Sequence, residues 1–232
     1  MFVIAMHAPE IAQSVRAGQF VNLGWERGPL LRRPFSVYRA NGDEIEIVLK
    51  EVGAGTRELL ATRSGDSISC LGPLGNGFEI RGPSAVLISG GLGVAPMPLA
   101  ARDARSVGAT VTWVHGARTA GELCTEFEGD RVIWATDDGS RGFHGTAVAA
   151  APDADVVLAC GPNRMLAAVA ERWPDAQVAV ETYMGCGTGV CLGCAVPMRV
   201  GGYERACKEG PVYRAADVNW EGLPSHLHYA IA

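Results

Sequence analysis

The first part of the chain alternates apolar and polar residues over short stretches, which predicts β-strands. Residues 44–49 (Glu-Ile-Glu-Ile-Val-Leu) alternate as a strand with one buried face should. Comparable apolar runs lie at residues 20–23, 34–38 and 67–71, and Gly, Asn or Asp separates most of them. Only residues 57–62 favour a helix, of one or two turns. This pattern predicts a small antiparallel barrel or sandwich over residues 1–82.

The pattern changes at residues 81–83 (Arg-Gly-Pro), after which strands and helices alternate. Residues 85–89 form a continuous apolar run, as expected for a parallel strand that is covered on both faces. Further strand-like runs lie at residues 110–114, 132–135, 156–159 and 178–180, and helical stretches at residues 97–107 and 163–173. This alternation predicts a doubly wound nucleotide-binding domain over residues 83–180.

The tail, residues 181–232, has little periodicity and holds four of the seven cysteines. A loop-rich tail of this length buries too little apolar surface to be ordered unaided, so we expect an inorganic centre to staple it. The predicted fold class is therefore α+β with three domains. An N-terminal antiparallel β-barrel is followed by an α/β doubly wound domain and a small C-terminal cluster domain.

Composition and charge narrow the function classes. The 232 residues are 48% hydrophobic with a net charge of −5, so the chain can build a core but is a poor partner for nucleic acid. No apolar run reaches the roughly 18 residues that span a bilayer, and the start lacks the basic region of a signal peptide. We expect no membrane partner and a cytoplasmic location, where reduced thiols act as ligands or core residues.

The cysteines of the tail carry the strongest chemical signal. Cys186, Cys191, Cys194 and Cys207 have the spacing C-x4-C-x2-C-x12-C. Four thiolates are the ligands of a [2Fe–2S] cluster, and this spacing begins as in plant-type ferredoxins. Four glycines among these ligands allow sharp turns and N–H groups aimed at sulfur. Structural zinc is the alternative, but zinc sites usually pair two C-x2-C-like knuckles, and only Cys191 and Cys194 form one.

A candidate flavin site is spread over three segments of the first domain. Arg33-Pro34-Phe35-Ser36 offers an Arg for pyrophosphate and a hydroxyl or amide for the edge of a flavin ring. Val48-Leu49-Lys50 follows, and then a Gly-x-Gly-Thr turn with Gly55 and Thr56 that can present N–H groups to phosphate. Taken singly, these are an edge strand and a glycine hairpin. Their occurrence in this order favours flavin binding.

A candidate nicotinamide site lies at strand ends of the second domain. Gly90, Gly91 and Gly93 follow the strand at residues 85–89 and open a helix, as a dinucleotide-phosphate turn requires. Cys160 and Gly161 end another strand, at the edge where open α/β sheets bind ligands. Asp138 ends a third strand and could contact a ribose. The alternatives are a small buried residue for Cys160 and an ordinary Asp-Gly turn for Asp138.

Together these motifs resemble the electron-transfer subunits of class B dihydroorotate dehydrogenases, within the ferredoxin–NADP reductase superfamily. The matching segments run in order across nearly the whole chain, and the cysteine block with the sequel Gly210-Pro211-Val212-Tyr213 is the most specific. The resemblance implies FAD held by the residues 33–36, 48–50 and 55–56, NADH at the second domain, and a [2Fe–2S] cluster. It further implies an FMN-containing catalytic dihydroorotate dehydrogenase partner in a heterotetramer with two subunits of each kind.

The implied function is an NAD-linked oxidoreductase subunit of pyrimidine biosynthesis that carries electrons and holds no dihydroorotate-oxidising residue. Lys50 departs from the family, where we expect Arg. The N-terminus is short, so residues 2–7 must form the first barrel strand, or that strand is shortened. Electron-transfer subunits of ferredoxin:NADP oxidoreductases or sulfhydrogenases are the alternative, and a zinc-stapled interaction module is another class. Exposed apolar residues around Val190, Leu192 and Gly193 are predicted to dock on the partner.

Overall fold

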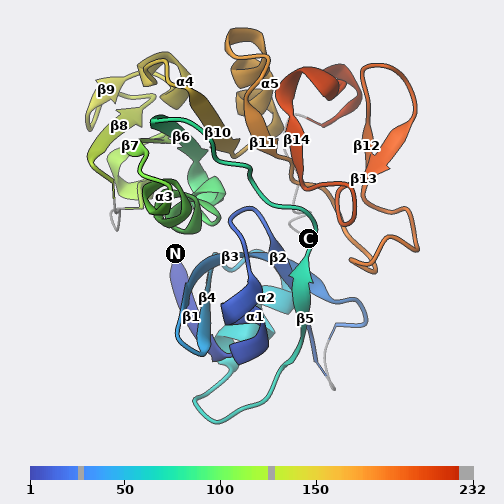
Figure 1. Cartoon of the computed structure of the whole chain (residues 1–232). Coiled ribbons are helices and arrows are strands. Elements are labelled where there is room, and N and C mark those ends of the chain that lie inside the picture. The colour runs from blue at the N-terminus through green and yellow to red at the C-terminus, as the bar shows by residue number, and fades with distance from the viewer. Residues whose placement is uncertain (26–28, 125–128, 225–232) are drawn as a thin grey trace.

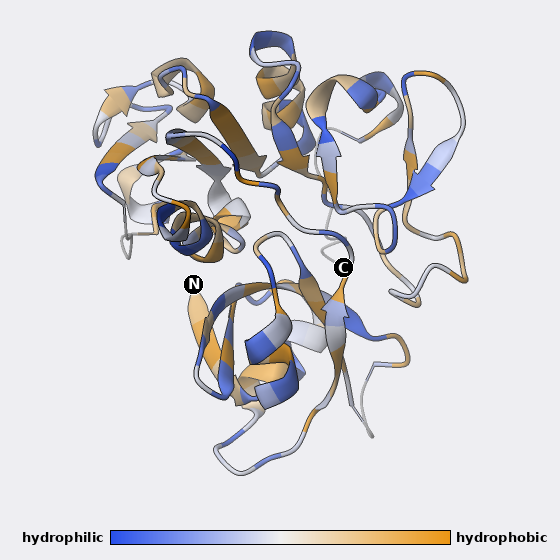
Figure 2. Ribbon diagram, viewed as in Figure 1, coloured by the Kyte–Doolittle hydropathy of each residue, from blue (hydrophilic) through white to orange (hydrophobic). Residues whose placement is uncertain are grey.

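The computed structural model describes residues 1–25, 29–124 and 129–224, which form two sheets and a small hairpin. In Figure 1 the N-terminal sheet lies at the bottom, the second sheet at the upper left and the tail at the upper right. Apolar colour runs along the central strands of the second sheet in Figure 2, as continuous apolar runs predict. Within the described residues, none of the helices is long and apolar enough to cross a membrane.

The N-terminal sheet is antiparallel, with strand order β1-β4-β3-β2-β5. Its elements are β1 (Phe2–His7), α1 (Pro9–Ser14), β2 (Phe20–Gly24), β3 (Arg33–Asn41), β4 (Glu44–Leu49), α2 (Ala54–Ala61) and β5 (Ser69–Leu74). The short N-terminus does supply the first strand, since Phe2 pairs with Leu49 and His7 with Glu44. The strand expected at residues 67–71 begins two residues later and runs on to Leu74, which pairs with Phe20.

The alternating apolar and charged residues of β4 are alternately buried and more exposed, as predicted. Ile45 and Ile47 are fully buried, whereas Glu44 is exposed and Glu46 half-buried. Glu46 forms an ion pair with Arg39 of β3 at 3.4 Å. One face of the sheet therefore belongs to the core, and the other carries charge, as a period of two residues requires.

The second sheet has the order β14-β11-β10-β6-β7-β8-β9 and is parallel except for β14. Its elements are β6 (Ser84–Gly90), η1 (Gly91–Val94), α3 (Met97–Ser106), β7 (Thr110–Ala117), η2 (Ala120–Glu122), β8 (Arg131–Thr136), β9 (Phe143–His144), α4 (Ala147–Ala150), β10 (Val156–Cys160), α5 (Asn163–Arg172) and β11 (Gln177–Ala179). From β6 the sheet is extended on one side by β7, β8 and β9, and the next strand, β10, pairs with the opposite side of β6. Ligands of doubly wound sheets bind at such a reversal, at the carboxyl ends of the strands.

The tail packs on the second sheet instead of forming a core of its own. It contains β12 (Ala195–Pro197), β13 (Tyr203–Arg205), β14 (Val212–Arg214), η3 (Ala215–Asp217) and η4 (Trp220–Gly222). Strand β14 pairs with β11 and is the edge of the second sheet. The buried residues Val196, Ala206 and Tyr213 share one apolar cluster with residues of β6 and α5. The domain limits at residues 82 and 180 remain a prediction. The second sheet includes β14, which lies after residue 180 in the sequence.

Candidate functional site: a cluster loop beside two nucleotide-binding edges

The four cysteines of the tail motif lie on one loop system, and all four are free thiols. Cys194 and Cys207 are buried, Cys186 is half-buried and Cys191 is exposed. The thiols of Cys194 and Cys207 are hydrogen-bonded, and Cys186 is near enough to act electrostatically on Cys207. The four residues of the motif offer thiols as donors, which suits iron–sulfur chemistry.

Backbone N–H groups surround the sulfurs of this loop. Thr188 and Cys191 donate to the Sγ atom of Cys186 at 3.4 and 3.5 Å, and Gly193 donates to Cys191 Sγ at 3.4 Å. Gly189 donates to Cys207 Sγ at 3.1 Å. Such N–H groups stabilise negative sulfur, as a cluster with thiolate ligands needs. They were expected from the glycines among the ligands.

These donors affect the thiols unequally. The N–H groups of Thr188 and Cys191 lower the pKa of Cys186 to about 5. Burial, reinforced by the neighbouring Cys194, raises the pKa of Cys207 to about 12. The loop therefore favours the thiolate at Cys186 by itself, whereas a positively charged centre would favour the thiolate at Cys207.

The loop has a backbone that few residues tolerate. Gly189 has a φ of +84°, in the left-handed region that glycine adopts without cost. Leu192 has a φ of +59°, and it is the only non-glycine residue with a positive φ among the described residues. These turns fold the loop tightly enough for its N–H groups to point inward at the sulfurs.

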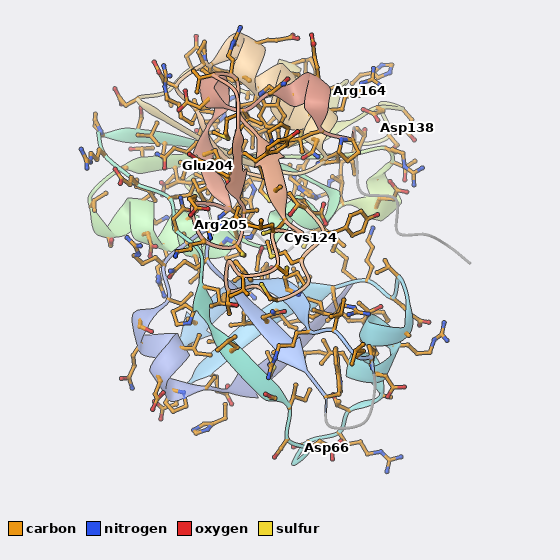
Figure 3. All side chains as sticks on the ribbon, turned by 90° about the vertical axis from the view of Figure 1, so that its right-hand side faces the viewer. Asp66, Cys124, Asp138, Arg164, Glu204 and Arg205 are labelled. Atoms are coloured by element: carbon orange, nitrogen blue, oxygen red, sulfur yellow. The ribbon has the colours of Figure 1, made fainter. Side chains whose placement is uncertain are left out.

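Arg205 holds the two halves of the loop system together. Its Nη1 atom donates to the carbonyl oxygen of Gly189 at 2.8 Å, and its Nε atom donates to Glu209 at 2.9 Å. A second guanidinium nitrogen of Arg205 also pairs with Glu209. In Figure 3, where the tail faces the viewer, Arg205 is labelled at the level where the tail meets the N-terminal sheet. The loop that carries Cys186 is thus fixed to the segment that carries Cys207.

Two segments of the candidate flavin site meet in the structure. Gly55 of α2 lies against the side chain of Arg33 of β3, because a Cβ atom at Gly55 would be 3.0 Å from Arg33 Cγ and Nε. Arg33 donates from Nη1 to the carbonyl oxygen of Leu31 at 2.6 Å. Pro34, Phe35 and Ser36 are half-buried beside it. The expected Arg and the expected glycine turn therefore face one another.

The start of α2 is shaped by Thr56. Its Oγ1 atom accepts from the N–H of Val52 at 2.8 Å and of Gly53 at 3.2 Å, and donates to the Gly53 carbonyl oxygen at 3.0 Å. This closes the turn and leaves the N–H groups of the first helical turn available to an anion. Val48 and Leu49 are buried in β4, and Lys50 is half-buried at its end.

The candidate nicotinamide turns meet where the strand order reverses. A Cβ atom at Gly93 would overlap the carbonyl oxygen of Cys160 and the nitrogen of Gly161, so only glycine fits there. Gly90 and Gly161 lie against Met165, whose Sδ and Cε atoms would be 2.9 and 2.6 Å from their Cβ atoms. The turns after β6 and β10 therefore form one surface at the carboxyl edge, as expected.

Asp138 lies apart from this junction, at the end of β8, and is labelled at the right of Figure 3. Its Oδ1 atom accepts from Ser140 Oγ at 2.6 Å and from Ser140 N at 3.0 Å. These bonds lower the pKa of the Asp138 carboxyl. Ser140 in turn accepts from the N–H of Ala120 at 2.8 Å, so the Asp-Gly turn is fixed to the start of η2 and exposes a carboxylate.

Comparison with known proteins decides the family. The family model of the iron–sulfur cluster binding domain of dihydroorotate dehydrogenase B matches residues 181–219. The electron transfer subunit of dihydroorotate dehydrogenase B (NAD(+)) of Bacillus caldolyticus is 38% identical, over 87% of this chain and 86% of that relative. The subunit of the same name from Desulforamulus reducens is 34% identical, over 95% of this chain and 93% of that relative.

This chain belongs to the family of dihydroorotate dehydrogenase B electron transfer subunits. Membership confirms the family that the motifs indicated and the predicted electron-transfer role. The match to a cluster-binding domain confirms iron–sulfur over zinc for the tail. Because the relatives are subunits by name, a catalytic partner subunit is implied as well.

Solved structures agree with this family's fold. A chain of the NADH-dependent reduced ferredoxin-NADP oxidoreductase, solved in a study of flavin-based electron bifurcation, superimposes with a TM-score of 0.85. It is 31% identical and covers 96% of this chain and 86% of its own length. The ferredoxin reductase of carbazole 1,9a-dioxygenase, 22% identical over 73% of this chain and 59% of its own length, shares the fold with a TM-score of 0.61. The predicted fold class is confirmed.

One buried histidine lies near the two edges, in the core position that its isolated place in the sequence allowed. His115 of β7 is fully buried, its Nδ1 lies 2.8 Å from Ser89 Oγ, and its Nε2 accepts from the N–H of Cys124 at 3.4 Å. Trp113 Nε1 also donates to Ser89 Oγ, at 2.9 Å. Burial, with a smaller contribution from the Lys50 ammonium, lowers the pKa of His115 to about 4. His115 is thus a neutral core residue, and Lys50 of the flavin segment faces the second domain.

Proposed function

We propose that this chain carries electrons between NAD(H), FAD and a [2Fe–2S] cluster, and to or from an FMN-containing dihydroorotate dehydrogenase subunit in pyrimidine biosynthesis. The observation that carries the proposal is the cluster loop. Four free thiols lie among inward N–H groups, and the loop is bonded to the strand that neighbours the flavin segment. FAD supplies hydride exchange with NAD(H) and single-electron exchange with the cluster.

The residues of the chain bind, orient and insulate these groups. Arg33, with the first turn of α2, presents positive charge and N–H groups for the pyrophosphate of FAD. The glycine turns after β6 and β10 bring the backbone close to a dinucleotide. Cys186, Cys191, Cys194 and Cys207 supply the four thiolates of the cluster. No residue of the chain is assigned a proton transfer to dihydroorotate, because that substrate belongs to the partner subunit.

The assembly is proposed to contain two subunits of each kind in the cytoplasm. The alternative is an electron-transfer subunit of another NAD(P)H-linked complex, favoured by the structural likeness to the ferredoxin-NADP oxidoreductase chain. The identity of the co-purified partner distinguishes the two. A partner that contains FMN and oxidises dihydroorotate supports the proposal, and a ferredoxin-dependent partner supports the alternative.

The cofactor content of the purified chain tests the proposal directly. We expect one FAD, two iron atoms and two acid-labile sulfides per chain, because four thiolates ligate one [2Fe–2S] cluster. Absorption, flavin extraction and metal analysis measure these values. One zinc per chain without labile sulfide would contradict the cluster assignment.

NADH is expected to be a better electron donor than NADPH, by roughly tenfold or more in kcat/KM. Asp137 and Asp138 put negative charge at the proposed ribose position, which disfavours a 2′-phosphate. The two arginines nearby are already engaged. Arg118 forms an ion pair with Glu122, and Arg141 stacks 4.5 Å above the Trp134 ring.

Steady-state dye reduction with each nucleotide measures this preference. Asp138→Asn serves as the informative variant, because it removes the charge and keeps the size and the bonds to Ser140. We expect this variant to reduce the difference in kcat/KM between NADH and NADPH. Equal kinetics with NADPH in the unchanged chain would count against the placement of the ribose.

A further inference from the structure

Asn22 joins the N-terminal sheet to the cluster loop across a long stretch of sequence. It lies in β2, is 1% exposed, and pairs with Pro34 of the flavin segment on β3. Its Nδ2 atom donates to the carbonyl oxygen of Cys186 at 3.0 Å. One side chain thus connects the strand beside the proposed flavin site with a proposed cluster ligand.

The contact is close enough to constrain the sequence of the loop. Gly187 has a φ of +72°, and a Cβ atom there would overlap Asn22 Nδ2. Any other residue would push the loop away from the amide. The backbone of the loop is therefore laid directly on Asn22, and the glycine after the first cysteine allows this approach.

Asn22 is itself held in place. Arg32 donates from Nη1 to the carbonyl oxygen of Asn22 at 3.0 Å and to that of Ser69 at 3.1 Å. Neighbouring strands β3 and β5 pair with β2 on both sides. The amide is thus a rigid support on a central strand, which is the kind of element that can fix a distance.

The orientation of the amide leaves one polar atom without a partner. A backbone carbonyl only accepts, so the nitrogen of Asn22 must face Cys186 and the amide cannot be flipped. Its Oδ1 atom is buried and has no hydrogen-bond partner among the described residues. An amide that served packing alone would be expected to have both ends paired. This free acceptor can receive an N–H or O–H group of a bound ligand.

We propose that Asn22 is a positioning residue that holds the Cys186 end of the cluster loop against the flavin strand, and so sets the rate of electron transfer between FAD and the cluster. The inference rests on the proposed function. Bound FAD would give the cluster one electron at a time without a bond between them, and the reduced flavin would lose its proton to solvent over the two transfers that return it to the oxidised state. Electron transfer weakens steeply with distance, so a loosened loop slows this step.

Asn22→Leu and Asn22→Asp test the inference in the full chain. Leucine removes the donor, and aspartate keeps the size but sets a carboxylate against the Cys186 carbonyl. After rapid mixing with NADH, flavin bleaching and cluster bleaching are followed separately. Cluster reduction is expected to slow about tenfold, which corresponds to about 1.4 kcal/mol, while the rate of flavin reduction stays unchanged. Flavin and iron contents establish that both variants are loaded.

Asn76→Leu is the matched control. Asn76 also ties the N-terminal part to the tail, through bonds from Nδ2 to the Glu209 and Val212 carbonyl oxygens at 2.8 and 2.7 Å, away from Cys186. We expect it to lower thermal stability and to keep the transfer rate.

The proposal is overturned if the rate of cluster reduction is unchanged in both Asn22 variants. It is also overturned if Asn76→Leu slows cluster reduction as much as the Asn22 variants do. Loss of the cluster from both Asn22 variants overturns it as well, because Asn22 would then serve folding of the loop. If the wild-type chain showed neither flavin nor iron–sulfur absorption, the proposed function itself would be refuted.

Discussion

Replacing Gly93 by alanine is expected to slow reduction of the flavin by NADH by about 100-fold, in a chain that keeps FAD and its cluster. The added Cβ atom would overlap the carbonyl oxygen of Cys160 and the nitrogen of Gly161. Because both are backbone atoms, the turns after β6 and β10 must separate. That separation removes the close backbone approach on which the proposed nicotinamide binding at this edge depends.

Stopped-flow bleaching of the flavin by NADH measures the loss, and dithionite reduction establishes that flavin and cluster are present. Gly108→Ala is the control, since Gly108 follows α3 with a φ of +84° and has no atom within 4 Å of an added Cβ. It should cost about 1–2 kcal/mol of stability through its left-handed backbone and leave NADH oxidation intact. A Gly93→Ala chain that reacts with NADH at the normal rate would mean that the dinucleotide binds elsewhere.

Most strands and helices could be predicted because each carries its own local pattern. The apolar run at residues 85–89 became the central strand β6, and the helix expected over residues 97–107 ends at Ser106, just before Gly108. The meeting of Gly93 with Cys160 also follows from a general rule. Carboxyl ends of parallel strands share one edge of a sheet, so two motifs at strand ends must be neighbours.

The contacts between domains could not be predicted, because they join residues that are far apart and chemically ordinary. Asn22 stands 164 positions before Cys186, and an Asn in a strand gives no sign of its partner. His115 looked like any isolated histidine, and only the fold places it beside Ser89 and Cys124. The membership of β14 in the second sheet was hidden for the same reason, since three residues carry too short a pattern.

The apolar residues of the tail divide into two groups. Val212 is buried in the core cluster that includes the N-terminal sheet, and Tyr213 is buried in the other cluster, where Trp220 and Leu223 pack against it. This is the packing role expected for part of the set. Val190 and Leu192, by contrast, are 80% and 63% exposed on the cluster loop, and Tyr229 lies outside the described residues. Leu192 stands between two of the proposed ligands, and the neighbouring Cys191 is itself exposed.

An exposed apolar residue beside an exposed cluster ligand is the arrangement expected of a docking surface for the implied catalytic subunit. A hollow of about 640 Å³ adjoins it, lined by Leu192, Tyr203 and Glu204 among others. The few interface residues that dominate binding cost about 2 kcal/mol or more when truncated, and they lie near the centre of the interface, where water is excluded. We therefore propose that the partner covers Leu192 and Val190 and excludes water from the cluster.

Leu192→Glu is expected to weaken association with the catalytic subunit by about 30-fold or more, because the interface would have to bury an unpaired carboxylate. NAD-linked dihydroorotate oxidation should be lost, whereas NADH-to-dye turnover through FAD should continue. Val107→Glu, on a side chain of similar exposure (59%) at the end of α3, should leave both activities unchanged. Co-purification and both assays are measured on the same preparations, with iron content as the check on the loop. A fully coupled complex formed by Leu192→Glu would place the docking surface elsewhere, because burying an unpaired carboxylate at the centre of an interface carries a large desolvation cost.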